Sequence, residues 1–316
     1  MELVSPPVFV VIPVYNDWES CILLVQEAEK NCSSAFFRRL RFCWVDDGST
    51  EPIPGNLLRP GFQDMLIGLT RNVGHQKAIA LGIACISEQF PGHTILVMDA
   101  DGEDRPGDME KLFSQAENQV RIAFARRTKR HEGLLFQLFY RLYKLVFTLL
   151  TGKKMAFGNF CCIPGAITGR VSHVSEIWNH FSGGIIKSRI PFISIPLERG
   201  KRLAGKSKMN FTGLVLHGLS AVSIYADYMA VRLVIFCLFL VGFSFAAIFS
   251  VALVKFFTPF ASPGWATTVI SGFTSIIMQS FLVSLLLLFV VLTYRTQKLF
   301  IPAKDFRDYI AEVRTV

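Results

Sequence analysis

The sequence predicts an α/β domain built on a mostly parallel sheet, followed by two membrane-spanning helices. Short apolar segments alternate with amphipathic helical patterns over residues 1 to about 125. Two long apolar runs without charge follow near the C-terminus. Hydrophobic residues make up 51% of the chain, yet its formal net charge is +9. This combination is typical of a protein at an anionic membrane or with a phosphate-rich ligand.

The expected elements of the N-terminal part follow one another as strand, helix and strand. Strands are predicted at residues 8–12, 41–45, 65–69, 94–98 and 121–125, and helices near 20–30, 76–87 and 109–116. The first apolar segment is short and contains Pro13, so it is interpreted as a strand and not as a signal peptide. In folds of this type, ligands bind at the carboxyl ends of the parallel strands.

The cysteines and the absence of known motifs exclude several other classes. The seven cysteines are scattered and show neither zinc-site nor redox-motif spacing, which indicates a reduced, cytosolic domain. Nucleic acid is not an expected partner, because no finger, RNA-recognition or basic-zipper pattern occurs.

The two apolar runs, at about 233–254 and 269–292, are each long enough to cross a bilayer as a helix. A buried core helix is the competing interpretation for either run. The linking residues 256–268 carry no charge, whereas basic residues flank the pair: Arg232 before it, and Arg295, Lys298, Lys304, Arg307 and Arg314 after it. The positive-inside rule therefore predicts a multi-pass protein of the inner or plasma membrane, with its N-terminal domain and both termini cytosolic.

These runs divide the chain into an N-terminal domain at 1–208, a juxtamembrane region at 209–231, a transmembrane region at 232–294 and a basic cytosolic tail at 295–316. Residues 210–225 show an imperfect helical stripe of apolar side chains. The stripe predicts an amphipathic helix lying on the membrane, or alternatively a helix packed on the domain.

Three predicted strands end in polar residues. The first ends at Pro13, Tyr15 and Asp17, the second at Asp47, and the fourth at Asp99 and Asp101. Carboxylates can accept hydrogen bonds from a base or a ribose, and an aromatic ring can stack on a base. Two carboxylates at i and i+2 after a strand can also share a divalent cation, since Mg²⁺ and Mn²⁺ prefer oxygen ligands.

These segments, Pro-Val-Tyr-Asn-Asp, Asp-Asp-Gly-Ser-Thr and Asp-Ala-Asp, together resemble glycosyltransferase family 2 with its GT-A fold. Residues 69–78 are similar to the Asn-x-Gly stretch of that family. Residues 199–209 resemble the Arg-x-x-Gly-x-Ser-Lys stretch of its dolichyl- and polyprenyl-phosphate branch, whose bacterial members often end in two transmembrane helices. The resemblance covers nearly the whole chain.

The resemblance implies an inverting transfer of a single sugar from a nucleotide-sugar to a polyprenyl phosphate, with UDP favoured over GDP. It places Pro13, Tyr15, Asp17, Asp47, Asn72, Lys77, Asp99 and Asp101 at the nucleotide-sugar, with Asp99 and Asp101 also at a cation (Mg²⁺ or Mn²⁺). Arginine forks suit phosphate oxygens. The basic candidates for the diphosphate and the lipid phosphate are Arg127, Arg130, Arg199, Arg202, Lys206 and Lys208, although any of these could instead contact anionic lipid headgroups.

The chain departs from the family pattern at two places. Gly102 and Glu103 stand where many relatives have Leu and Gln, while Asp104 is retained. Asn159 stands where some relatives have an aspartate proposed as a base or metal contact, and an amide cannot act as a base. Either the anionic acceptor needs no base, or another carboxylate such as Asp104 serves, or activity is lost.

Two other functions remain open at this point. A processive polysaccharide synthase usually has more spans and a Gln-x-x-Arg-Trp motif, and neither is visible. A non-catalytic membrane adaptor that binds nucleotide or lipid is the other, and Asn159 is its best support. The expected partners are otherwise a nucleotide-sugar, a polyprenyl phosphate, the bilayer and further copies in a homo-oligomer. His75 and His217 are interpreted as structural.

Overall fold

The structure is a computed structural model that describes residues 6–117, 119–127, 148–149, 151–152, 158–205, 218–258 and 264–315. The chain divides into two compact units. The first comprises residues 1–139, 155–224 and 299–316, and the second comprises residues 140–154 and 225–298. The first unit is therefore made of segments from both sides of the second.

The first unit contains a sheet that, among the described residues, has the strand order β7-β5-β6-β4-β1-β2-β3-β8. Its parallel centre is β3-β2-β1-β4. The predicted strands are confirmed with small shifts at their ends: β1 is Val8–Val14, β2 Leu40–Asp46, β3 Met65–Leu69, β4 Thr94–Val97 and β5 Ile122–Arg127.

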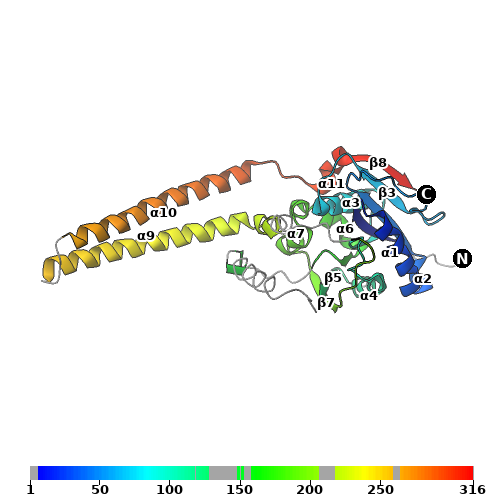
Figure 1. Ribbon diagram of the computed structural model, residues 1–316, viewed down its shortest axis with the longest axis horizontal. Coiled ribbons are helices and arrows are strands. Elements are labelled where there is room, and N and C mark those ends of the chain that lie inside the picture. The colour runs from blue at the N-terminus through cyan, green and yellow to red at the C-terminus, as the bar shows by residue number, and fades with distance from the viewer. Residues whose placement is uncertain are drawn as a thin grey trace. The chain divides into compact units, whose positions relative to one another are not determined.

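Three further strands complete the sheet: β6 Cys161–Ile163, β7 Phe192–Leu197 and β8 Ile310–Thr315. β6 runs antiparallel between β4 and β5, and β7 pairs in parallel with β5 at one edge. β8 runs antiparallel to β3 at the other edge, beside it in Figure 1. The last strand thus lies within residues 295–316, which the sequence predicted to be a basic tail.

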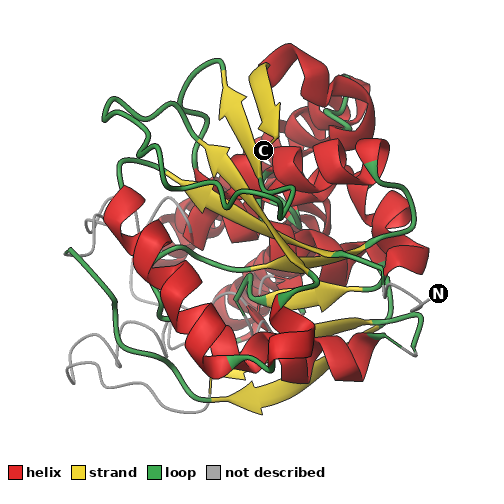
Figure 2. Ribbon diagram, turned by 90° about the vertical axis from the view of Figure 1, so that its right-hand side faces the viewer, coloured by secondary structure: helices red, strands yellow, loops and turns green. Residues whose placement is uncertain are grey.

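Helices cover both faces of the sheet (Figure 2). One face packs against α1 and α4 and the other against α3, with a separate apolar core on each side. The predicted helices are α1 Trp18–Asn31, α3 His75–Gln89 and α4 Met109–Ala116. Further helices among the described residues of this unit include α2 Ser34–Phe37, η1 Pro106–Asp108, α6 Gly165–Ser172, η2 Ser175–Trp178, α7 Phe181–Ser188, α11 Pro302–Asp305 and η3 Phe306–Tyr309.

The second unit is dominated by two long helices, α9 Ala226–Phe257 and α10 Trp265–Thr296, which lie side by side (Figure 1). In each, the most apolar window has a mean hydropathy of 2.6, and only 11% and 6% of those windows are buried. Both are long and apolar enough to span a membrane, and both extend beyond the predicted runs. Residues 209–217 of the predicted juxtamembrane region lie outside the described residues, while residues 218–223 are helical.

Candidate functional site

The end of β1 brings the first group of predicted residues to the carboxyl edge of the sheet. Pro13 is buried within β1, opposite Val45. Tyr15, just beyond the strand, is 43% exposed. Asp17 occupies the N-cap position of α1, where its Oδ1 accepts a hydrogen bond of 2.7 Å from the Ser20 hydroxyl. An exposed ring and a carboxylate therefore stand at this rim.

Asp47, predicted at the nucleotide-sugar, holds the backbone of a neighbouring loop. It is buried, and its two carboxylate oxygens accept hydrogen bonds from the backbone amides of Val73 at 2.7 Å and Gly74 at 2.9 Å. Burial raises the pKa of Asp47, although these hydrogen bonds lower it. In this structure the carboxylate fastens the loop at residues 70–74 to the end of β2.

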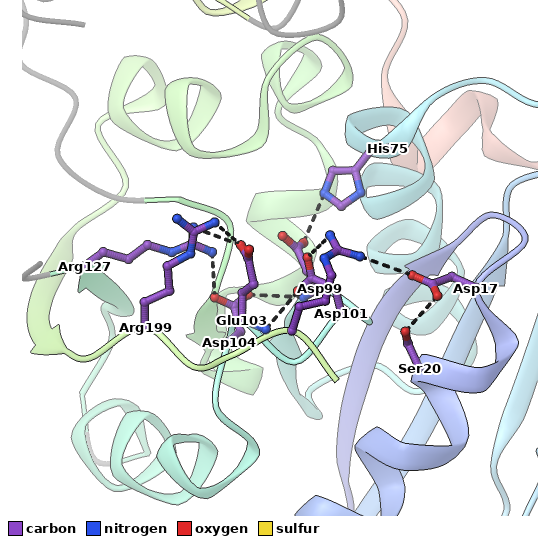
Figure 3. A network of polar contacts seen from close by, with 10 residues as sticks. Asp17, Ser20, His75, Asp99, Asp101, Glu103, Asp104, Arg127 and Arg199 are labelled. Atoms are coloured by element: carbon purple, nitrogen blue, oxygen red, sulfur yellow. Dashed lines mark hydrogen bonds and ion pairs between the residues drawn. The ribbon is translucent and has the colours of Figure 1, made fainter. Parts of the chain in front are cut away.

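The end of β4 carries three aspartates that meet basic side chains from distant segments (Figure 3). Asp99 Oδ1 lies 3.1 Å from Nε2 of His75, the first residue of α3. The same His75 nitrogen lies 3.2 Å from the side-chain amide nitrogen of Asn159, just before β6. Asp99, His75 and Asn159 therefore form one contact group.

Asp101 is paired with an arginine from a distant loop. Its Oδ2 accepts a hydrogen bond of 2.7 Å from Arg202, whose other terminal nitrogen lies 3.9 Å from Asp17 Oδ2. Oδ1 of Asp101 accepts from the backbone amide of Glu103 at 2.9 Å. The guanidinium of Arg202 thus links the strand ends of β1 and β4.

The third aspartate, Asp104, is buried and belongs to a second set of ion pairs. Its Oδ1 accepts a hydrogen bond of 3.2 Å from Arg127, at the end of β5, and its Oδ2 accepts from the backbone amide of Asp99 at 3.2 Å. Glu103 pairs with Arg127 at 3.7 Å and with Arg199. Arg127 and Arg199 therefore share one carboxylate, and Figure 3 shows both pointing toward it.

These side-chain contacts belong to two loops, residues 101–105 and 198–205, that pack on each other. The backbone amide of Gly200 donates to the Glu103 carbonyl at 2.8 Å, and that of Leu203 donates to the Asp101 carbonyl at 2.9 Å. An exposed ion pair of 3.1 Å joins Arg105 to Glu198. The basic loop therefore covers the acidic segment.

Burial and repulsion between carboxylates raise the pKa of two aspartates in the acidic group formed by Asp99, Asp101, Glu103 and Asp104. Burial and the charge of Asp99 raise the pKa of Asp101, and the same two causes raise the pKa of Asp104 against the lowering effect of Arg127. A cation near Asp99 and Asp101 would relieve this repulsion.

Hard carboxylate oxygens at Asp99 and Asp101 suit Mg²⁺ or Mn²⁺. Across the described part of the chain, however, no three His, Cys, Asp or Glu side chains are arranged to hold a metal ion. Asp99 and Asp101 thus offer two carboxylates, and a cation held by them would need its other ligands from elsewhere.

The structure brings together most of the site residues predicted from the sequence, but not all. Asn72 is exposed in the loop that Asp47 fastens. The Lys77 ammonium lies 5.1 Å from the ring centre of Trp178. Arg130, Lys206 and Lys208 lie outside the described residues.

Two residues of the site, His75 and Glu103, were not predicted as functional. The signal for His75 was its place directly after Gly74, at the start of the helix that follows β3. The signal for Glu103 was its departure from the family pattern beside Asp101. The contacts of His75 with Asp99 and of Glu103 with Arg199 join segments remote in sequence, so the sequence alone did not reveal them.

Two curated relatives are both named undecaprenyl-phosphate 4-deoxy-4-formamido-L-arabinose transferase. That of Photorhabdus laumondii is 27% identical over 216 residues, covering 66% of this chain and 64% of the relative. That of Yersinia enterocolitica is 28% identical over 177 residues, covering 55% of this chain and 51% of the relative. The chain thus matches less than two thirds of the length of each.

Similar solved structures include glucosyl-3-phosphoglycerate synthase from Mycobacterium tuberculosis in complex with Mn²⁺, UDP-glucose and glycerol 3-phosphate. Its TM-score is 0.49 at 12% identity, with 71% of this chain and 80% of that chain covered. A mannosyltransferase from Pyrobaculum calidifontis in complex with GDP-mannose and Mn²⁺ has a TM-score of 0.43 at 13% identity, with 89% and 87% covered.

Residues 9–178 match the family model described as glycosyl transferase family 2. The match covers more than half of the 316 residues and includes the ends of β1, β2 and β4 with the acidic group. The chain belongs to glycosyl transferase family 2.

Proposed function

We propose that this protein is a glycosyltransferase that moves one sugar from a nucleotide-sugar to a polyprenyl phosphate. The observation that carries the proposal is the convergence of Asp17, Asp99, Asp101 and Asp104 with Arg127, Arg199 and Arg202 at the carboxyl edge of a mostly parallel sheet. The two curated relatives are named as sugar transferases that act on undecaprenyl phosphate, and this supports the acceptor class.

The donor would lie across the ends of β1, β2 and β4. Tyr15, exposed beyond β1, is positioned to stack on a base, and Asp17 can accept hydrogen bonds from the nucleoside. Asp99 is the corresponding acceptor at the end of β4. Asp47 acts indirectly, because its oxygens hold the loop that carries Asn72. We favour UDP over GDP as the nucleotide.

The reaction would be a single displacement that inverts the anomeric centre. An oxygen of the acceptor phosphate forms a bond to the anomeric carbon while the bond from that carbon to the diphosphate breaks. The acceptor is already anionic, so it needs little deprotonation, and this suits an amide at Asn159. Positioning and compensation of negative charge then supply the rate enhancement.

Arg127 and Arg199 are the residues placed to compensate that charge. Both are held by Glu103 within a part-buried network, so their guanidinium groups are oriented before a phosphate arrives. Arginine can bind two phosphate oxygens at once. We assign Arg130, Lys206 and Lys208 the same kind of role on the basis of the sequence.

Asp99 and Asp101 are the residues that would hold a divalent cation, Mg²⁺ or Mn²⁺. Such a cation supplies Lewis-acid stabilisation of the leaving diphosphate. Asp101 accepts a hydrogen bond from Arg202 in the structure, so that guanidinium must move from Asp101 when the donor complex forms. The displaced Arg202 would then be available to the diphosphate itself.

The acceptor is a lipid, which gives α9 and α10 their role. Their length and mean hydropathy of 2.6 suit a membrane anchor. We propose that they span the membrane, with the first unit and both termini on the cytosolic side, where nucleotide-sugars are available.

One observation favours a second candidate, a non-catalytic membrane protein that binds nucleotide. Arg202 neutralises Asp101 in the structure, and Asn159 stands where some relatives have an acid. A protein of this kind would bind a nucleotide-sugar but release no product.

The experiment that tests the proposal is an assay of the purified full chain with undecaprenyl phosphate and a panel of UDP- and GDP-sugars. We expect one donor to yield nucleoside diphosphate and a lipid carrying a single sugar, in the presence of Mg²⁺ or Mn²⁺. Asp101→Asn should lower kcat/KM by about 100-fold or more, because it removes a carboxylate that would hold the cation at the diphosphate. Glu29→Gln, at an exposed carboxylate of α1, is the matched control.

The outcomes separate the candidates. Nucleotide binding without turnover for any donor would favour the non-catalytic protein. A polymeric product would indicate a processive synthase, and equal turnover with and without chelator would remove the cation.

A further inference from the structure

The segment after the second long helix is an integral part of the sheet domain. The chain leaves the first unit after Ile224 and re-enters it at Leu299. There it forms α11, η3 and β8, and β8 pairs with β3 along its whole length. Phe306, 4% exposed, joins the apolar core on the α3 face. The returning segment is therefore anchored independently of the long helices.

This segment contributes two rings to an aromatic cluster of three members, Trp178, Phe300 and Tyr309. Trp178 and Phe300 stack with ring centres 3.8 Å apart. Tyr309 meets both edge-on, at 5.1 Å from Trp178 and 5.4 Å from Phe300. Aromatic pairs of this geometry contribute beyond their buried area, so the position of the Tyr309 ring is well defined.

The aromatic cluster contacts residues 70–77, which comprise the loop after β3 and the first residues of α3 and are called loop 70–77 below. The backbone amide of Thr70 donates to the Tyr309 carbonyl at 2.9 Å. The Arg71 guanidinium lies 6.0 Å from the centre of the Tyr309 ring, and the Lys77 ammonium lies over Trp178. Both ends of the loop thus touch the cluster.

The middle of the same loop is held at the candidate site. Asp47 accepts hydrogen bonds from the amides of Val73 and Gly74. Gly48, at φ +72, comes so close that an added Cβ would lie 2.7 Å from the Asn72 nitrogen. His75 then reaches Asp99. The loop is therefore fixed on one side by β2 and on the other by the returning C-terminal segment.

We propose that the C-terminal segment positions loop 70–77 for donor binding, with Tyr309 as the positioning residue. Tyr309 contacts this loop at Thr70 and Arg71, at its start, so Tyr309 acts through the loop. The proposal rests on the proposed function for its kinetic consequence, because the loop carries Asn72 and leads to His75, which contacts Asp99. It also gives the segment after the second long helix a positioning role.

The test compares three variants of the full chain: Tyr309→Leu, Tyr309→Phe and Phe306→Leu. Phe306→Leu removes a buried ring of the same segment from the apolar core on the α3 face, so it controls for lost stability. Tyr309→Leu should raise the donor KM about tenfold and change kcat much less, since misplaced binding groups weaken donor capture. Tyr309→Phe keeps the ring and should restore the donor KM.

A second measurement follows the loop directly, without any donor. Hydrogen exchange at the amides of Val73 and Gly74, which Asp47 protects, should accelerate in Tyr309→Leu at least fivefold more than in Phe306→Leu, about 1 kcal/mol of local opening free energy. Equal exchange in these two variants would overturn the positioning role whatever the activity. Faster exchange in Tyr309→Leu together with no turnover by the unaltered protein would reject the proposed function and keep the positioning role.

Discussion

At the scale of single residues, the contact of Asn159 with His75 is the most informative departure of this chain from its family. Its amide nitrogen lies 3.2 Å from the His75 ring nitrogen, which in turn lies 3.1 Å from Asp99. Burial and the charge of Asp99 already raise the pKa of Asp101 and Asp104 nearby. An amide at position 159 therefore avoids a further negative charge beside this group.

This argument predicts the effect of restoring an acid. Asn159→Asp should lower kcat/KM about tenfold, because an added carboxylate repels both the diphosphate and the acceptor phosphate. Steady-state kinetics with varied donor and acceptor would measure it, with Asn56→Asp in an exposed loop as the control. An increase in kcat would mean instead that the reaction uses a base at this position and that the present chain lacks one.

At the scale of elements, the packing of loop 198–205 on loop 101–105 depends on a glycine that this chain has in place of the usual leucine. Gly102 has φ +78, and a Cβ there would lie 2.3 Å from Cγ of Leu203. The same loop pair carries the Arg202–Asp101 and Arg199–Glu103 ion pairs. The glycine thus permits the basic loop to reach the acidic segment.

Gly102→Ala should accordingly separate the two loops. We expect it to cost about 1–3 kcal/mol more than Gly205→Ala, because Gly205, in the same loop pair, also has a positive φ, +65, but no atom within 4 Å of an added Cβ. Chemical denaturation would measure the stability difference, and donor KM should rise in Gly102→Ala alone. Equal losses in the two variants would show that the backbone conformation, and not loop contact, sets the requirement for glycine.

At the scale of the whole molecule, the two long helices form an insertion within the sheet domain. The residues before and after them, up to Ile224 and from Leu299, belong to one compact unit. Under the proposal that α9 and α10 span the membrane, the chain crosses it twice and returns to the side of the first unit. This connectivity agrees with the basic flanks and the uncharged link that the sequence presents.

A topology experiment checks the proposed orientation. A membrane-impermeant thiol reagent should label Thr258→Cys, at the end of α9, in intact cells, and should label Arg314→Cys, in β8, only after permeabilisation. All seven native cysteines are buried, which keeps the background low. Labelling of Arg314→Cys in intact cells would place the sheet domain on the other side of the membrane.

Much of the fold could be predicted because its signals are local. Five of the sheet's strands, three helices and both long apolar helices follow from hydrophobic periodicity and charge. The strands β6, β7 and β8 could not be predicted in the same way. β6 has only three residues, too few for a periodic pattern. β8 has the sequence Ile-Ala-Glu-Val-Arg-Thr, whose charges are compatible with an exposed edge strand and equally with a tail.

The sequence by itself determined the class of fold, the family and the strand ends that carry the polar candidate residues. It could do so because apolar periodicity and short motifs are properties of neighbouring residues. Only the tertiary structure decided the partners: Arg202 on Asp101, His75 between Asp99 and Asn159, and the C-terminal segment against loop 70–77. Those pairs are up to about 240 residues apart along the chain. Their contacts arise from the packing of elements whose order in the sheet no local pattern specifies.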